Sequence, residues 1–326
     1  MRKRISVYLF LFLGLAILGY LMYNIEWEAL KSAFTMVGYQ IFIVFGAALL
    51  WIASNAMCLS TLVNHKVPFY YLIYTQVTGD AYNSITPFGG LGGVPVKINH
   101  LTSYLTLPHA SETIIRDQLI HTMSGIMFTA FLSFLAIGVL PYERNYVIPL
   151  LTLGVVFLVL SVLFIWLIFS DKPGKLLERI LKKVKMLADY RSNPIERTIF
   201  LQALGFKMLG RLLGMVELLI IFLLLGLSPS FLDILTVMTI LTIGSSILFI
   251  FPQGIGVHEA GITGAFTILG YSAAMGLSFG LIRRARGLFW MIFGIALHLV
   301  VVLFNKKDVT TSVPTNKPTL RRKEKF

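Results

Sequence analysis

The sequence predicts an all-α, polytopic integral membrane protein. Of its 326 residues, 56% are hydrophobic and only 13% are charged, about half the charged fraction of a typical soluble domain. Several apolar runs reach the roughly 20 residues that a helix needs to cross the hydrocarbon core of a bilayer. In chain order, these runs cover 5–23, 39–63, 118–140, 146–169, 199–227, 231–251 and 287–304.

The first run, residues 5–23, follows three basic residues, as the apolar part of a signal peptide does. No small-residue cleavage pattern follows it, because Ile25, Glu26 and Trp27 stand there. We therefore expect an uncleaved first helix. The single cysteine, Cys58, lies in the second run, so neither disulfides within the chain nor cysteine metal clusters are expected.

Basic residues gather in three segments: the N-terminus, the loop 171–198 and the tail 305–326. Together they hold 12 of the 13 net positive charges. Lys and Arg near the ends of membrane helices stay on the cytoplasmic side. We therefore expect a multi-pass cell-membrane protein whose two termini and basic loop are cytoplasmic. The loop also reads as an amphipathic helix on an anionic leaflet, although its lysines could serve topology alone.

Two further apolar stretches, around 70–105 and 258–280, are interrupted by Pro, Gly and charged residues. Sliding the chain by 165 residues aligns the two interruptions. This predicts one membrane domain over 1–326 with about eight transmembrane helices, made of halves at about 1–160 and 170–305. Coincidence among abundant glycines is the alternative. The residues expected at the two hairpin turns are Pro87, Gly89, Gly92, Pro252, Gly254 and Gly256.

Three complete crossings separate the two interruptions, and an odd number of crossings places them on opposite faces of the membrane. Pro removes a backbone donor and Gly relaxes the backbone, so each stretch should form two half-helices around an irregular turn. This is the layout of an inverted repeat, whose broken helices meet near the bilayer midplane around a substrate. Free amides at the half-helix N-termini would suit an anion. The alternative is a pair of kinks that only improve packing.

Motifs of soluble enzymes are incomplete in these stretches. Gly90-Leu-Gly92 lacks the third glycine of a dinucleotide fingerprint, with Pro95 in its place, and His258-Glu259 lacks the histidine at position 262 that a zinc protease needs. We therefore predict no catalytic residue, no metal and no cofactor, and no direct binding of nucleic acid.

Charged side chains cluster around the two interruptions, and basic ones outnumber acidic ones. Such groups are costly at membrane depth and usually face a cavity or a partner; snorkelling and structural ion pairs are the alternatives. We expect Arg116 and Asp117 to open a helix that carries His121 on the face of Asp117, and Arg286 to lie at the membrane interface. The residues predicted to bind substrate, an anionic headgroup, are Lys97, Arg116, Asp117, His121, Arg211, Glu259, Arg283 and Arg284.

Three segments carry a family resemblance: Asn83-Ser-Ile-Thr-Pro-Phe-Gly-Gly-Leu-Gly-Gly-Val-Pro-Val-Lys97, Pro252-Gln-Gly-Ile-Gly-Val-His-Glu259 and Leu281-Ile-Arg-Arg284. Together they resemble the transmembrane region of lysylphosphatidylglycerol synthases, the flippase-like family of the multiple peptide resistance factor type. The resemblance covers about residues 5–305 and gives no residue a catalytic role. It implies movement of an aminoacylated phospholipid between leaflets, linked to resistance to cationic antimicrobial peptides.

Members of this family often carry a soluble transferase domain that uses lysyl-tRNA to modify phosphatidylglycerol. The 22 residues after Phe304 are too few for such a domain. We therefore expect a lipid flippase or lipid-linked carrier that binds membrane phospholipid, with a separate transferase and a second copy of the chain as conceivable partners. The alternatives are a lysyl-tRNA-dependent phosphatidylglycerol lysyltransferase and a non-transporting subunit that binds anionic lipid.

Overall fold

The computed structural model describes residues 27–86, 92–139, 144–169, 195–247 and 256–311. Within these ranges every regular element is a helix, which agrees with the predicted all-α class. The first predicted span, most of the basic loop and most of the tail lie outside them. The helices are α2 (Trp27–Val37), η1 (Gly38–Gln40), α3 (Ile41–Leu62), α4 (Phe69–Ile85), α5 (Val94–Leu101), α6 (Leu107–Val139), α7 (Arg144–Phe169), α9 (Arg197–Leu224), α10 (Phe231–Ile247), α11 (Val257–Ile268) and α12 (Ala273–Thr311).

Three of these helices are long and apolar enough to cross a membrane: Phe34–Leu62, Leu107–Ile137 and Ala273–Phe304. Shorter apolar helices cover Leu151–Trp166 and Phe231–Thr242. Only 6% of the apolar window in the last long span is buried, so most of that surface faces outward, as expected for contact with lipid. The chain is therefore a helical membrane protein.

Two helices begin well before the apolar runs that predicted them. The helix expected to open at Arg116 begins at Leu107, and the one expected from residue 287 begins at Ala273. Both extensions contain charged residues that lower the local hydropathy without opposing the helix, because Arg, Lys and Glu are good helix formers. Hydropathy thus found the lipid-facing part of each helix and missed the part that faces the interior.

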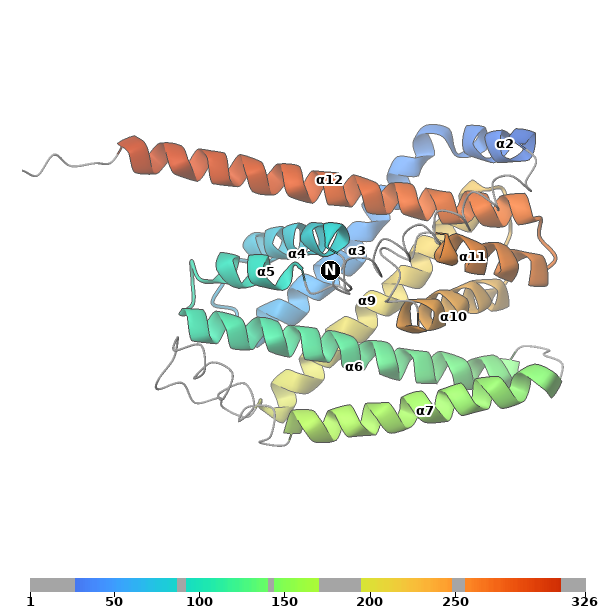
Figure 1. Cartoon of the computed structure of the whole chain (residues 1–326), viewed down its shortest axis with the longest axis horizontal. Coiled ribbons are helices and arrows are strands. Elements are labelled where there is room, and N and C mark those ends of the chain that lie inside the picture. The colour runs from blue at the N-terminus through green and yellow to red at the C-terminus, as the bar shows by residue number, and fades with distance from the viewer. Residues whose placement is uncertain (1–26, 87–91, 140–143, 170–194, 248–255, 312–326) are drawn as a thin grey trace, which may run out of the picture.

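Two helical hairpins pack against the long helix α12. Helix α4 packs on α5, and α10 packs on α11. Along its length α12 contacts α4 at one end and α11 at the other, and Figure 1 shows it crossing above both hairpins. Helices α3 and α9 cross through the middle of the molecule, and α6 and α7 pair on the side away from α12.

The series α3, α4, α5, α6 recurs as α9, α10, α11, α12. Helix α4 begins at residue 69 and α10 at 231, α5 at 94 and α11 at 257, and α6 at 107 and α12 at 273. The contacts between the series are reciprocal, because α4 packs on α12 as α10 packs on α6. Each hairpin therefore rests on the last helix of the other series.

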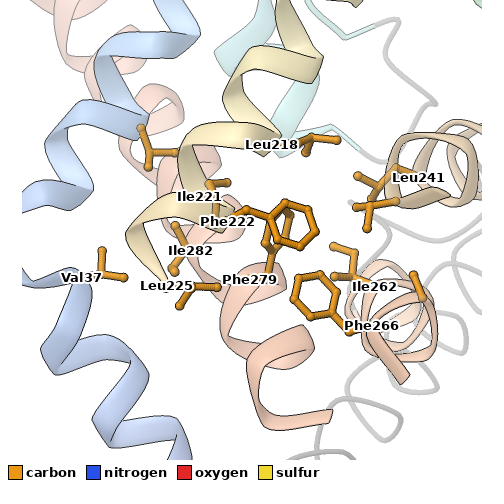
Figure 2. Packing of buried hydrophobic residues seen from close by; sticks show 13 residues of the cluster. Val37, Leu218, Ile221, Phe222, Leu225, Leu241, Ile262, Phe266, Phe279 and Ile282 are labelled. Atoms are coloured by element: carbon orange, nitrogen blue, oxygen red, sulfur yellow. The ribbon is translucent and has the colours of Figure 1, made fainter. Parts of the chain in front are cut away.

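An aromatic core lies between the second hairpin and its neighbours α9 and α12 (Figure 2). The Phe222 and Phe266 rings stack with their centroids 5.0 Å apart, and Phe279 packs on both. These residues come from α9, α11 and α12, so the core fixes the second hairpin to its neighbours. The first hairpin has an aliphatic core instead, formed by Ala56, Leu59, Val63, Val67, Leu72, Leu101, Ala110 and Ile114.

Glycines on α12 allow close contact with both hairpins. A Cβ added at Gly294 would come within 2.7 Å of Ala81 Cβ in α4. At Gly276, an added Cβ would lie 2.8 Å from the Thr263 backbone in α11. Both distances are shorter than real contacts allow, so these two positions exclude any side chain while the hairpins stay in place.

Candidate functional site

The interrupted helices and their neighbours enclose one cavity of about 970 Å³. Every helix from α3 to α7 and from α9 to α12 contributes to its wall. Six basic and three acidic side chains line it, an excess of three positive charges. The charged lining residues are Asp80, Lys97, Asp117, Lys207, Arg211, Glu259, Arg283, Arg284 and Arg286.

The first hairpin contributes Lys97, a buried cation on α5. Its Nζ donates to Gln76 Oε1 at 2.6 Å and to Asp80 Oδ1 at 2.9 Å. Both partners lie on α4, four residues apart and therefore on one helix face. The charge of Lys97 is thus balanced within the hairpin itself. The Asp80 side chain is 37% exposed toward the cavity.

Two glycines make the first hairpin tight enough for this pairing. A Cβ at Gly79 would overlap the side-chain carbons of Lys97, and a Cβ at Gly93 would overlap the carbonyl of Gly79. The Gly93 amide, at the start of α5, donates to Asn83 Oδ1 at 2.6 Å. This half-helix N-terminus, which we expected to offer its amide to an anion, is therefore capped by the hairpin's own side chain.

The second hairpin contributes a buried anion, Glu259. Its Oε2 accepts from the Gly256 amide at 2.8 Å, at the start of α11, and its Oε1 pairs with Arg284 on α12. Gly256 has φ +77°, a conformation that glycine adopts without strain. Glu259 is thus both the turn cap and one half of an ion pair between the hairpin and α12.

Two further arginines of α12 share one carboxylate. The Nε atoms of Arg283 and Arg286 lie 3.5 and 3.4 Å from Glu217 Oε1 on α9. Neither arrangement meets hydrogen-bond geometry, and all three atoms are buried without a hydrogen-bond partner. One positive charge therefore remains unbalanced here. Arg286, which we expected at the membrane interface, lines the cavity because the inner face of α12 continues past Arg283.

A polar cluster joins α3, α6 and α9 deep in the molecule. Lys207 Nζ lies 2.7 Å from Asp117 Oδ1 and donates to Asn55 Oδ1 at 3.0 Å. Cys58 Sγ donates to Asp117 Oδ1 at 3.4 Å. Both charged side chains are less than 5% exposed. Removing either one would leave a buried charge without its counter-ion.

Arg211 differs from the other basic residues of the cavity. It donates to Ser124 Oγ at 3.1 Å and to the His121 carbonyl at 3.0 Å. Within the described ranges, no ion pair includes it. A Cβ at Gly125 would lie 2.8 Å from its Nη2 atom, so the glycine leaves room for the guanidinium. Arg211 is therefore a cation that an entering anion could neutralise.

Seven of the eight residues predicted to bind substrate line this cavity. The exception is Arg116, which pairs with Glu112 one turn away on α6. The structure brings the seven together; that they bind a substrate stays a prediction. The seven are Lys97, Asp117, His121, Arg211, Glu259, Arg283 and Arg284.

Four of the expected hairpin-turn residues, Pro87, Gly89, Pro252 and Gly254, lie outside the described ranges. The other two, Gly92 and Gly256, stand at the edges of the described hairpins. A Cβ at Gly92 would overlap the side chain of Thr86, and Gly256 has the positive φ noted above. Glycine is thus required at both positions for steric reasons.

The selection from sequence missed several cavity residues, most of them uncharged or already paired. Gln76, Asp80 and Asn83 recur at helical spacing before the first interruption, and Lys207 precedes Arg211 by four residues. Both patterns place polar groups on one helix face and could have identified these residues. Within the described part of the chain, no group of three or more His, Cys, Asp or Glu residues is placed to hold a metal ion.

A family model described as the lysylphosphatidylglycerol synthase TM region matches residues 5–296. No curated protein and no solved structure matches the chain.

Proposed function

Because the chain belongs to the lysylphosphatidylglycerol synthase TM region family, a membrane protein with a lipid-related role, we propose that it moves an anionic or aminoacylated phospholipid between the two leaflets. The observation that carries this proposal is the cavity, about 970 Å³ in volume, with its excess of positive charge. A phosphate headgroup would enter it while the acyl chains stay in the bilayer.

The unbalanced charges favour an anionic headgroup. Arg211 has no carboxylate partner among the described residues, and Arg283 and Arg286 share Glu217. Arginine is well suited to such a role, because its planar guanidinium binds phosphate oxygens in pairs. A phosphodiester next to Arg283 and Arg286 would supply the missing negative charge. It would also accept hydrogen bonds from their buried Nε atoms.

The recurrence of the two helix series supports an inverted repeat. In the proposed topology, about eight helices cross the membrane, both termini are cytoplasmic, and the hairpins α4–α5 and α10–α11 enter from opposite faces. Alternating access in such folds exposes one site to each side in turn. The ion pair between Glu259 and Arg284 joins the second hairpin to α12, so its opening would release one side of the cavity.

A liposome assay tests this function. Purified protein is reconstituted with a fluorescent anionic phospholipid or a fluorescent lysyl-phospholipid, and leaflet exchange is followed by dithionite quenching. We expect exchange above that of empty liposomes, and at least tenfold slower exchange for Arg211→Gln and Arg283→Gln. Arg197→Gln, at an exposed position on α9, is the matched control and should keep the wild-type rate.

The same preparation separates the alternatives. Exchange no faster than in empty liposomes would rule out transport under these conditions. Binding of the labelled lipid without exchange would instead support a non-transporting lipid-binding subunit. Transfer of lysine from charged tRNA to phosphatidylglycerol by the purified chain would support the lysyltransferase.

A further inference from the structure

Two histidines and a tyrosine meet where the first hairpin touches α12. His100 Nε2 on α5 lies 3.1 Å from His298 Nδ1 on α12. The hydroxyl of Tyr74, on α4, is 3.3 Å from His100 Nε2 and 3.2 Å from His298 Nδ1. The three polar atoms form a nearly equilateral triangle, so each lies within hydrogen-bond distance of the other two. The triangle joins the first hairpin to the last helix of the chain.

The hydrogen bonds around Thr78 assign the ring proton of His100. The Thr78 hydroxyl donates its single proton to the Tyr74 carbonyl, 2.7 Å away. Its oxygen lies farther, 3.3 Å, from His100 Nδ1. We therefore assign the hydroxyl as the acceptor there and place the ring proton on Nδ1. A neutral imidazole has one N–H and one lone pair. His100 Nε2 is therefore the lone-pair nitrogen that faces His298 and Tyr74.

This geometry has room for one additional proton. When His100 Nε2 gains a proton, it can donate to the lone pair of His298 Nδ1, and one positive charge is shared between the rings. If His298 Nδ1 carried a proton as well, two N–H groups would face each other at 3.1 Å, and the contact would break. Two such interacting groups titrate as a pair.

The groups that face the histidine pair are neutral. From α4, the Tyr71 hydroxyl donates to the His100 carbonyl at 3.1 Å, and the Tyr82 ring meets the His298 ring edge-on, with centroids 5.5 Å apart. Tyr104 packs against Tyr71 with its ring centroid 5.0 Å away. Within the described ranges, neither histidine of the pair forms an ion pair. No carboxylate of the described residues therefore faces the pair, and the two rings alone share the added charge.

The pair lies next to the charged wall of the cavity. Lys97 precedes His100 by three residues on α5, and its partners Gln76 and Asp80 flank Thr78 on α4. A proton on the histidines would thus act within one helical turn of the Asp80–Lys97 ion pair. It would also change the contact that holds α12 to the first hairpin.

We propose that His100 and His298 form a binding site for one proton, and that this proton is the coupling ion for the lipid movement proposed above. This inference rests on the proposed function and adds that a proton gradient drives the lipid movement. Proton binding adds one positive charge where the first hairpin meets α12, and proton release removes it. A pH gradient can then drive the lipid toward one leaflet.

The test measures the steady-state distribution of the fluorescent lipid across proteoliposomes with an imposed pH gradient. Potassium and valinomycin hold the membrane potential at zero. One-to-one coupling predicts that the ratio of lipid in the two leaflets shifts about tenfold per pH unit, in either direction. Equal leaflets in the wild type, with exchange still present, would overturn this inference and leave the proposed function standing. Absent exchange would count against the function itself.

Variants locate the proton. His100→Gln and His298→Gln should abolish the shifted ratio, whereas His109→Gln, at an exposed histidine on α6, should retain it. A ratio that stays shifted in both His100→Gln and His298→Gln would place the proton elsewhere and refute the assignment.

A second measurement does not depend on lipid exchange. Potentiometric titration of the purified chain from pH 8 to pH 3.5 should show one more proton bound by the wild type than by the double variant His100→Gln, His298→Gln. A difference of zero or of two protons per chain would contradict the shared site.

Discussion

The two hairpins have the same arrangement of helices and opposite charges near their tips. The first, α4–α5, carries a cation, Lys97, and balances it internally with Asp80. The second, α10–α11, carries an anion, Glu259, and obtains its counter-ion from α12 through Arg284. The first hairpin is thus electrostatically self-contained, whereas the second depends on a neighbour. The position of the second hairpin therefore depends on α12 through this ion pair.

The largest loss of stability is expected when the charge of Glu259 is removed. Glu259→Gln keeps an oxygen for the Gly256 amide but leaves Arg284 without its carboxylate in a largely buried site. Breaking a buried pair in this way costs roughly 3–5 kcal/mol of stability. The thermal unfolding midpoint in detergent should therefore fall clearly.

The matched variant in the first hairpin is Asp80→Asn. Lys97 would keep its bond to Gln76, and the lost carboxylate is 37% exposed where that of Glu259 is 2% exposed. We therefore expect a smaller loss, about 1–3 kcal/mol, because the buried Lys97 still loses one partner. Equal losses for Asp80→Asn and Glu259→Gln would remove the proposed asymmetry between the hairpins.

A smaller effect is expected where α12 contacts each hairpin. Gly294→Ala should separate α12 from α4, and Gly276→Ala should separate it from α11, because the added Cβ meets atoms closer than 3 Å. Such overpacking costs about 1–3 kcal/mol. The expected result is a similar fall in the unfolding midpoint for both variants.

Gly264→Ala is the control for this pair. A Cβ at Gly264 meets nothing within 4 Å, so the alanine should stabilise α11 by roughly 0.5–1 kcal/mol through its higher helix propensity. If this variant also destabilised the protein, replacing glycine by alanine would be harmful even without a steric overlap. The losses at positions 276 and 294 could then not be assigned to the close contacts of α12.

The smallest loss of stability is expected when the hydrogen bond between Tyr271 and Asp233 is removed. The Tyr271 hydroxyl donates to Asp233 Oδ2 at 2.9 Å, and Asp233 also accepts from the Ser230 amide at the start of α10. Tyr271→Phe should therefore cost about 1 kcal/mol, measured as a shift in the unfolding midpoint at neutral pH.

Partial burial and the hydrogen bond to Asp233 raise the pKa of Tyr271. A group with a raised pKa contributes stability that is fully present below its unfolded pKa, near 10 for tyrosine, and is lost as pH rises through the folded value. The difference between wild type and Tyr271→Phe should thus shrink as the buffer becomes strongly alkaline. A difference already absent at neutral pH would argue against this hydrogen bond.

The fold was largely predictable because it depends on hydropathy and on strong backbone signals. Apolar runs predicted α3, α7, α9 and α10 to within a few residues at most ends, and the Pro and Gly interruptions predicted the breaks between α4 and α5 and between α10 and α11. The starts of α6 and α12 were missed because charged residues interrupt the apolar pattern, at Glu112 and Arg116 in α6 and at positions 283, 284 and 286 in α12. Hydropathy cannot distinguish a polar helix that faces a cavity from a polar loop.

The sequence predicted many of the residues that form the candidate site, but it did not predict which of them pair with each other. Charge at membrane depth identified Lys97, Arg211 and Glu259 as residues of interest. It could not assign Asp80 rather than Asp117 to Lys97, or Arg284 rather than Arg283 to Glu259, because those choices depend on how helices distant in sequence cross. The His100–His298 contact was missed for the same reason: 198 residues separate the two rings.

The spacing along α12 restricts how this gene can change in length. Gly276 and Gly294 are eighteen residues apart, which is five turns of helix, so both point to the same side. Inserting or deleting one residue between them would rotate one glycine by about 100° relative to the other. One hairpin would then meet a bulky side chain. Insertions and deletions should therefore be absent from this stretch in functional homologues.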